Sequence, residues 1–163
     1  MSAYQTLIVG TDGSDSSLRA VDHAAAFAAE NDAKLIIAMA HLPNVDHGGW
    51  ANPGRPDRVL DPRAETPLGR EGDYKLHGDA PVYAILREAR NRARKAGARH
   101  IEERALVGAP APALVKLAKE VNADLLVVGS FGLTSTGGRI LGSVPANVSR
   151  RARTDVLIVH TTD

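Results

Sequence analysis

The sequence contains no cysteine among its 163 residues. That absence excludes disulfide bonds, thiolate metal ligands and a cysteine nucleophile, and it fits a reducing compartment. Aromatic residues make up only 4% of the chain, so a stacking surface for single-stranded nucleic acid is not expected. No apolar run reaches the roughly 18 residues of a membrane-spanning helix. The first residues also lack the basic start and cleavage site of a signal peptide. We therefore expect a cytoplasmic protein that has no contact with membranes.

The positive and negative charges nearly balance, because the chain has 20 Lys and Arg residues and 19 Asp and Glu residues. Nothing in this balance requires a polyanionic partner, so nucleic-acid binding is not expected. The six histidines show no metal-ligand spacing, and no Ser/His/Asp set is visible. We expect no catalytic residues and no resident metal ion.

Short apolar runs alternate with segments of helical periodicity, which predicts an α/β fold. Strands are expected over residues 6–11, 34–40, 102–107, 124–129 and 155–160, and helices over residues 14–30, 81–96, 110–121 and 144–151. The runs TLIVGT, LIIAMA, DLLVVG and DVLIVH are apolar on both faces, which is typical of a parallel sheet covered by helices on either side. Ligands of such doubly wound sheets bind beyond the carboxyl ends of the strands, where the strand order reverses.

Residues 43–79 do not follow this alternation. They hold five of the nine prolines and many Gly, Asp and Arg residues. The simpler hypothesis is a surface loop inserted into the domain. The alternative is a lid over a ligand or a partner-binding arm.

A glycine-rich stretch from Gly129 to Ser143 follows the fourth predicted strand and precedes a predicted helix. Glycines let the backbone approach a phosphate closely, and the unpaired N–H groups at a helix start favour an anion. Ser143 is predicted to be the N-cap of that helix. The stretch is not a Walker A loop, because no Lys precedes Ser143, and no GxGxxG or GxSxG motif is present.

The first strand is followed by GTDGSDSS, residues 10–17. Asp12 is placed where it could accept hydrogen bonds from a ribose hydroxyl, and the alternative is that it caps the first helix. Ser14 and Asp15 are expected to be helix caps rather than ligand contacts.

These segments together resemble the nucleotide-binding universal stress proteins. Gly129, Gly132, Gly142 and Ser143 match the phosphate motif G-x2-G-x9-G-[ST] of that family. The resemblance covers the whole chain, and SVPANVSRRA is especially similar to an actinobacterial branch in which some members bind cyclic AMP as well as ATP. It implies one domain over residues 1–163, with a Rossmann-like sheet of strand order 3-2-1-4-5 and helices on both faces.

The resemblance also implies the residues of the site. The nucleotide would be cyclic AMP or ATP, and ATP could bind together with Mg²⁺. Ribose would contact Asp12, adenine Ala40 and His41, and phosphate the glycine stretch. The implied nucleotide-binding set is Gly10, Thr11, Asp12, Ala40, His41, Val107, Gly108, Gly129, Ser130, Gly132, Gly142, Ser143, Val144 and Pro145. The family's dimer, which pairs the last strand with its twin, would use Val156, Leu157, Ile158 and Val159.

Three positions depart from the family pattern. Phe131 stands where many relatives carry Arg or His beside the phosphates, and Gly10 replaces a bulkier residue, which would leave room against the base or ribose. Pro145 would fix the first turn of the last helix. Together they favour a singly charged phosphate such as that of cyclic AMP, while Arg139 is expected to be an exposed surface residue.

Three functions stay open. The first is a regulatory sensor or sink that binds cyclic AMP and ATP without significant turnover. The second is a slow ATPase or phosphotransferase. The third is an interaction module whose ligand is incidental.

Overall fold

The computed structural model describes residues 4–41, 80–130 and 143–160. The predicted insert at 43–79 and most of the glycine-rich stretch, including Gly132 and Gly142, lie outside these described residues. Within the described part, strands and helices alternate as the sequence predicts, and most boundaries differ from the prediction by one or two residues.

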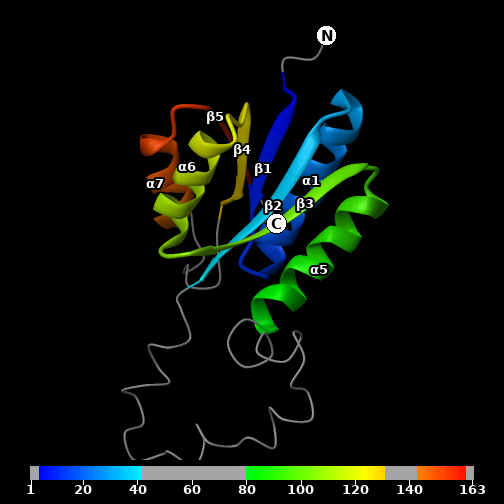
Figure 1. Cartoon of the computed structure of the whole chain (residues 1–163), viewed down its shortest axis with the longest axis horizontal. Helices are drawn as coiled ribbons and strands as arrows, with labels where there is room; N and C mark the ends of the chain where they lie inside the picture. Colours follow the sequence, from blue (N-terminus) through cyan, green and yellow to red (C-terminus); the bar gives the residue numbers. More distant parts are fainter. Residues whose placement is uncertain (1–3, 42–79, 131–142, 161–163) are drawn as a thin grey trace, which may run out of the picture.

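The five strands form one parallel sheet with the order β3-β2-β1-β4-β5. They are β1 (Thr6–Gly10), β2 (Lys34–His41), β3 (His100–Val107), β4 (Leu125–Gly129) and β5 (Asp155–Val159). The chain runs outward from β1 to β3 and then crosses back to β4, on the other side of β1 (Figure 1). The strand order therefore reverses between β1 and β4, and the predicted topology is confirmed.

Helices cover both faces of the sheet (Figure 1). On one face α1 (Asp15–Asn31) and α5 (Ala80–Lys95) pack together, and on the other α6 (Pro110–Glu120) and α7 (Ser143–Arg151) do so. Two apolar cores result, one on each side of the central strands. Leu7 and Val9 point into the first core, whereas Ile8 points into the second, because successive strand side chains face opposite sides.

Small residues let α1 lie close to the sheet. Ala20, Ala24 and Ala28 are buried on its inner face, and their spacing of four follows the helical period. The helix ends at Asn31, and its C-cap Asp32 has a left-handed backbone and donates its N–H to the carbonyls of Ala28 and Ala29. None of the described helices is both long enough and apolar enough to cross a bilayer.

The two edges of the sheet differ in chemistry. The middle of β3 carries Glu102, Glu103 and Arg104, and such charges discourage pairing with another strand. On β5 only Val159 is buried, and Leu157 is 37% exposed. The expectation that β5 is apolar and covered on both faces is therefore wrong, because an edge strand has one neighbour and less helix above it.

An ion-pair cluster on β2 and β3 predicts a pH dependence of stability. Glu102 accepts hydrogen bonds from Lys34 Nζ at 2.9 Å and from Arg104 Nε at 2.6 Å. The Lys34 bond first, and then the Arg104 bond, hold the pKa of Glu102 below its ordinary value of 4.5. A lowered folded-state pKa stabilises the protein above the unfolded pKa, and the contribution is lost as the pH falls through the folded pKa.

We expect Glu102→Gln to lower the free energy of unfolding at pH 7 by about 0.2–1 kcal/mol, because these side chains are partly exposed. The difference from the unmodified protein should shrink toward zero at an acidic pH below the lowered pKa of Glu102. Urea unfolding of both proteins at the two pH values measures it. A difference of equal size at both values would contradict the prediction.

Candidate functional site

The candidate site lies at the carboxyl ends of β1 and β4, where the strand order reverses. Gly10 ends β1 and is followed by Thr11 and Asp12, and Gly129 ends β4 and is followed by Ser130. The two strands are direct neighbours, with Val9 paired to Val127. Asp12, the predicted ribose contact, and Gly129, the start of the predicted phosphate stretch, thus lie at the same end of the sheet, where β1 and β4 finish.

Ser17 organises the turn from β1 into α1. Its hydroxyl lies 2.9 Å from Thr11 Oγ1 and 3.0 Å from the carbonyl of Ser14, and it accepts the N–H of Asp12 at 3.2 Å. Because the single hydroxyl proton of Ser17 is donated to the Ser14 carbonyl, Thr11 Oγ1 donates to Ser17 Oγ and accepts the N–H of Gly13 at 3.1 Å. Ser17 and Thr11 are both buried. This network holds the backbone of Asp12 in place.

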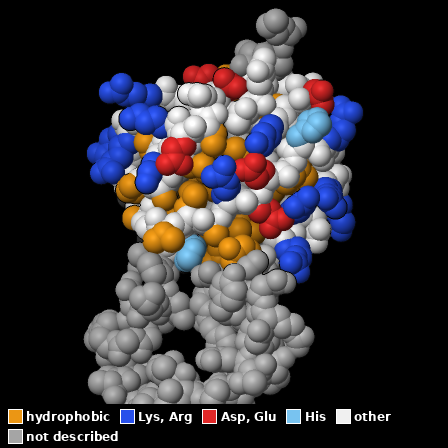
Figure 2. Space-filling model, in the orientation of Figure 1, with side chains coloured by type: hydrophobic (Ala, Val, Ile, Leu, Met, Phe, Trp, Pro, Cys, Tyr) orange, Lys and Arg blue, Asp and Glu red, His pale blue; other side chains and the backbone are white. Residues whose placement is uncertain are grey.

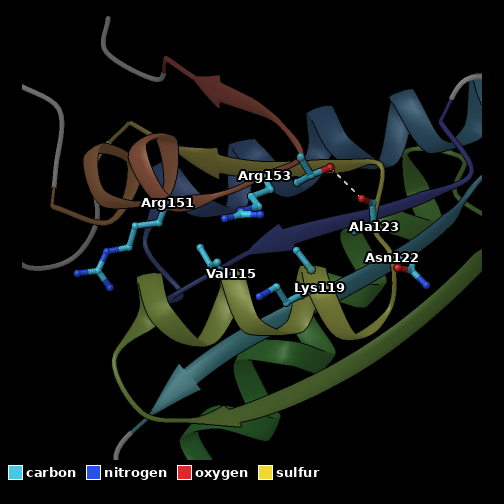
Figure 3. Close-up of a pocket in the computed structure, with 8 residues that line it drawn as sticks. Val115, Lys119, Asn122, Ala123, Arg151 and Arg153 are labelled. Carbon is cyan, nitrogen blue, oxygen red and sulfur yellow. Dashed lines mark hydrogen bonds between the residues drawn. The ribbon is translucent and has the colours of Figure 1, made fainter.

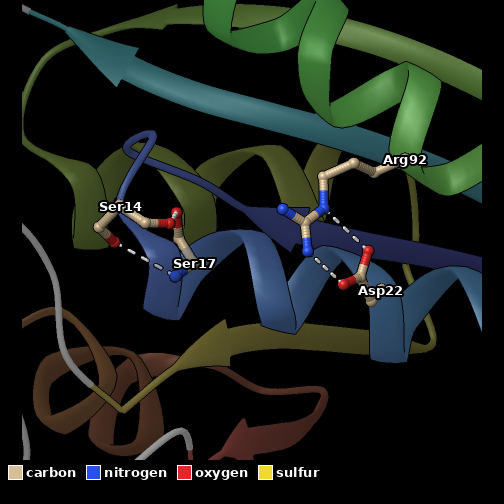
Figure 4. Close-up of polar contacts among 4 residues, drawn as sticks. All are labelled: Ser14, Ser17, Asp22 and Arg92. Carbon is tan, nitrogen blue, oxygen red and sulfur yellow. Dashed lines mark hydrogen bonds and ion pairs between the residues drawn. The ribbon is translucent and has the colours of Figure 1, made fainter.

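The turn before α1 bears on the capping role that the sequence left open for Asp12. Ser14 is the N-cap of α1, since its Oγ accepts the N–H of Ser17 at 3.2 Å (Figure 4). Asp12 Oδ1 accepts the N–H of Ser14 at 2.9 Å. This hydrogen bond forms an Asx turn that leads into the N-cap of the helix. The capping role predicted for Ser14 is confirmed, and Asp12 is therefore not the helix cap. Its half-buried carboxylate is oriented at the sheet edge.

Gly129 is required by packing as well as by its place in the glycine stretch. A Cβ at this position would lie 2.9 Å from Ser16 Oγ and 3.0 Å from the Ser16 carbonyl oxygen. The first turn of α1 therefore lies directly against the end of β4. The next residue, Ser130, is fully buried and donates its N–H to the carbonyl of Val159 at 2.9 Å.

The space predicted beside Gly10 is not open. A Cβ there would lie 2.8 Å from Leu114 Cδ1, so α6 occupies it. The interpretation that Gly10 leaves room against a base or ribose is wrong, because the missing side chain would point into the core beneath α6.

The ends of β2 and β3 lie beside the β1 turn. Ala40 and His41 are half-buried, and the His41 carbonyl accepts the N–H of Gly108 at 2.9 Å. Gly108 has φ +120, a conformation that other residues rarely adopt. Val107 is 66% exposed. The predicted adenine contacts therefore lie at the carboxyl ends of the strands, as Asp12 does. They are on the β2 side of β1, whereas β4 is on its other side.

Helix α7 begins one residue earlier than predicted. Ser143 is its first residue rather than its N-cap, and its carbonyl accepts a hydrogen bond from Asn147 Nδ2 at 2.9 Å. The prediction is wrong by one position because sequence cues place a helix start only approximately. Val144 is half-buried and Pro145 is buried in the first turn, where a proline is tolerated. Phe131, Gly132, Arg139 and Gly142 lie outside the described residues.

The predicted dimer residues lie on β5, which is an edge strand of the sheet that the described residues form. Val156 and Ile158 pack against the α6–α7 core, whereas Val159 belongs to the α1–α5 core. Leu157 is the most exposed of the four at 37%.

Sequence reasoning missed two residues of the site, Ser16 and Ser17. A polar residue three positions after a predicted N-cap is the signal that could have singled out Ser17, because its N–H meets the cap. Nothing local points to Ser16, whose importance comes from its contact with β4. In the described ranges, no group of three or more His, Asp and Glu side chains could hold a metal ion.

The order β3-β2-β1-β4-β5, with polar turns and glycines at the reversal of strand order, defines a doubly wound, Rossmann-like α/β protein. The model of the universal stress protein family matches residues 3–50 and 55–160. The chain therefore belongs to the universal stress protein family.

Individual relatives agree with this assignment. The universal stress protein Rv1636 of Mycobacterium tuberculosis strain H37Rv is 57% identical over 162 residues, which cover 99% of this chain and 100% of that protein. A crystal structure of a universal stress protein in complex with cyclic AMP shares 55% identity, with a TM-score of 0.70 over 99% of this chain and 100% of that one. The universal stress protein UspA from Lactobacillus plantarum, at 21% identity over 98% of this chain and 99% of its own, has a TM-score of 0.71 and shows that the fold is shared.

Proposed function

We propose that this protein binds cyclic AMP and ATP at the carboxyl edge of its sheet and acts as a regulatory sensor or sink without significant turnover. The observation that carries the proposal is the 55% identity, over 99% of the chain, to a universal stress protein crystallised with cyclic AMP. At that identity the two chains share one fold, and residues of the site are expected to correspond.

The geometry of the β1 turn supports a sugar contact. Asp12 is half-buried. Its backbone N–H donates to Ser17 Oγ, and its Oδ1 accepts the N–H of Ser14. A carboxylate oriented in this way can accept hydrogen bonds from ribose hydroxyls without first losing much side-chain entropy.

The phosphate contact is supported by the start of α7. The first N–H groups of a helix have no partner within the helix, and the helix dipole favours an anion there. Ser143 and Val144 supply the first two of these groups. A cyclic phosphate carries one negative charge, and so it needs fewer cationic partners than a triphosphate. We therefore expect cyclic AMP to bind more tightly than ATP.

The wider proposal is a cytoplasmic homodimer that contributes to a stress response. Among the described residues β5 is an edge strand with Leu157 exposed, which supports pairing with a second copy, since an edge strand is a template for another strand. Sedimentation of the protein and of Leu157→Lys tests this. Dissociation of the variant to monomers is expected, and an unchanged mass would contradict a β5 dimer.

Calorimetric titration with cyclic AMP and with ATP tests the binding proposal. We expect Asp12→Ala to weaken cyclic AMP binding by at least about tenfold, the equivalent of one lost hydrogen bond to a charged group. Asp15→Ala is the matched control, because Asp15 is an exposed carboxylate in the first turn of the same helix. Equal losses in both variants, or tighter binding of ATP than of cyclic AMP, would contradict the proposal.

Incubation with ATP and Mg²⁺ tests the absence of turnover. We expect no sustained release of ADP above a protein-free control. Sustained release that disappears in Asp12→Ala would instead identify a slow ATPase or phosphotransferase.

A further inference from the structure

A cationic pocket lies at the amino ends of β4 and β5, whereas the candidate nucleotide site lies at the carboxyl ends of the strands. It opens between α6 and the turn that joins α7 to β5, and its volume is 240 Å³. Both helices end here, and β4 and β5 begin here. The pocket is lined by the apolar residues Val115, Ala118 and Ala123 and by the cations Lys119, Arg151 and Arg153.

The side chains of this pocket point in different directions (Figure 3). Arg153 extends into the space between the α7–β5 turn and α6, and Lys119 lies along the same side of α6. The guanidinium of Arg151 points outward from the rim. Lys and Arg side chains also gather over this end of the molecule in the space-filling view (Figure 2).

The cations of the pocket are not neutralised by the described residues. None of the described side chains that line the pocket is acidic, and no ion pair within the described ranges involves Lys119, Arg151 or Arg153. Two arginines of α5, in contrast, have acidic partners. Arg90 pairs with Glu103, and Arg92 of α5 reaches Asp22 of α1 (Figure 4). Like charges that share a pocket repel one another, and an anion bound between them offsets that repulsion.

Basic residues often lie at helix ends because they interact favourably with the last carbonyls. Here the carbonyls at the end of α6 have other donors. The Leu117 carbonyl accepts the N–H of Val121 at 3.0 Å, and the Ala118 carbonyl accepts the N–H of Ala123 at 2.9 Å. The carbonyl of Ala123 in turn accepts Thr154 Oγ1 at 2.8 Å. The pocket cations are therefore not needed to satisfy these groups.

We propose that this pocket binds a small organic phosphomonoester. Its doubly charged phosphate would contact Lys119 and Arg153, since ionised donors make the strongest hydrogen bonds to phosphate. Its apolar part would lie on Val115 and Ala118. The pocket is smaller than the roughly 300–1,000 Å³ of sites for drug-sized ligands, so the ligand is a small one.

Calorimetric titration with phenyl phosphate, at low ionic strength to limit screening, tests the proposal. We expect saturable binding of one equivalent. Phenyl sulfate has the same shape and one charge less, so it should bind more weakly. The double variant Lys119→Gln/Arg153→Gln should weaken phenyl phosphate binding by at least about tenfold, because two charge-assisted contacts are lost.

The matched control is Lys116→Gln/Arg150→Gln, which removes the same charge from α6 and α7 outside the pocket. The control should bind phenyl phosphate as the unmodified protein does. Equal weakening in both double variants would mean attraction by net charge only, and would overturn the proposal. Unchanged affinity in the pocket variant would place the ligand elsewhere, for instance at the glycine stretch, and would also overturn it. A lower melting temperature of the pocket variant with unchanged affinity would show that these cations serve only the helix ends.

Discussion

Gly129→Ala is expected to lower the free energy of unfolding by about 1–3 kcal/mol, the usual cost of forcing extra volume into a packed interior. The new methyl group would lie 3.0 Å from the carbonyl oxygen of Ser16 and 3.2 Å from its carbonyl carbon. A backbone in the first turn of a helix cannot rotate away as a side chain can. The start of α1 must therefore move, and Asp12 would move with it. We expect cyclic AMP affinity to fall by at least about tenfold, the equivalent of one charged hydrogen bond.

Gly10→Ala is the matched control for this variant, because both glycines are buried at the ends of neighbouring central strands. The methyl group at Gly10 would meet Leu114 Cδ1, the end of a side chain, at 2.8 Å. A small rotation of Leu114 relieves that contact, so the cost should stay below about 1 kcal/mol. Urea unfolding gives both stabilities. Equal costs for the two variants would show that the Ser16 backbone yields easily and that the packing argument is wrong.

Ser17→Ala is expected to have the second largest effect, about 1–3 kcal/mol of unfolding free energy, because it leaves buried polar groups without a partner. The Thr11 hydroxyl and the Asp12 N–H both bond to Ser17 Oγ. Ser149→Ala is the control, since its exposed hydroxyl donates to the carbonyl of Ala146, and its loss should change stability by less than about 0.5 kcal/mol.

The role of Ser17 in ligand binding is that of a positioning residue, which acts through Asp12. Ser17→Ala should therefore weaken cyclic AMP binding in the unmodified background and much less in an Asp12→Ala background. Calorimetry on the four proteins of this cycle measures the coupling. Independent, additive losses would show that Ser17 stabilises the fold without orienting Asp12.

Local patterns were sufficient for the helices, the strands and the doubly wound α/β class, whereas the strand order came from the family resemblance. The apolar runs around Leu7, Leu35 and Leu126 and the helical spacing of Leu18, Val21 and Ala25 predicted the elements, because both periodicities are properties of neighbouring residues. The cap at Ser14 followed from residue type and place. Errors appeared where the environment decides burial, as at β5, whose apolar sequence looks like that of a covered strand.

The sequence by itself thus determined the doubly wound α/β class, the edge of the sheet where Asp12 and Gly129 lie, and the family. Only the tertiary structure decided that α1 packs on Gly129, that Leu114 fills the space beside Gly10, and that Lys119 and Arg153 share a pocket. The physical reason is that these contacts join segments distant in the chain. Their geometry depends on how closely each helix packs on the sheet, and no periodicity encodes that distance.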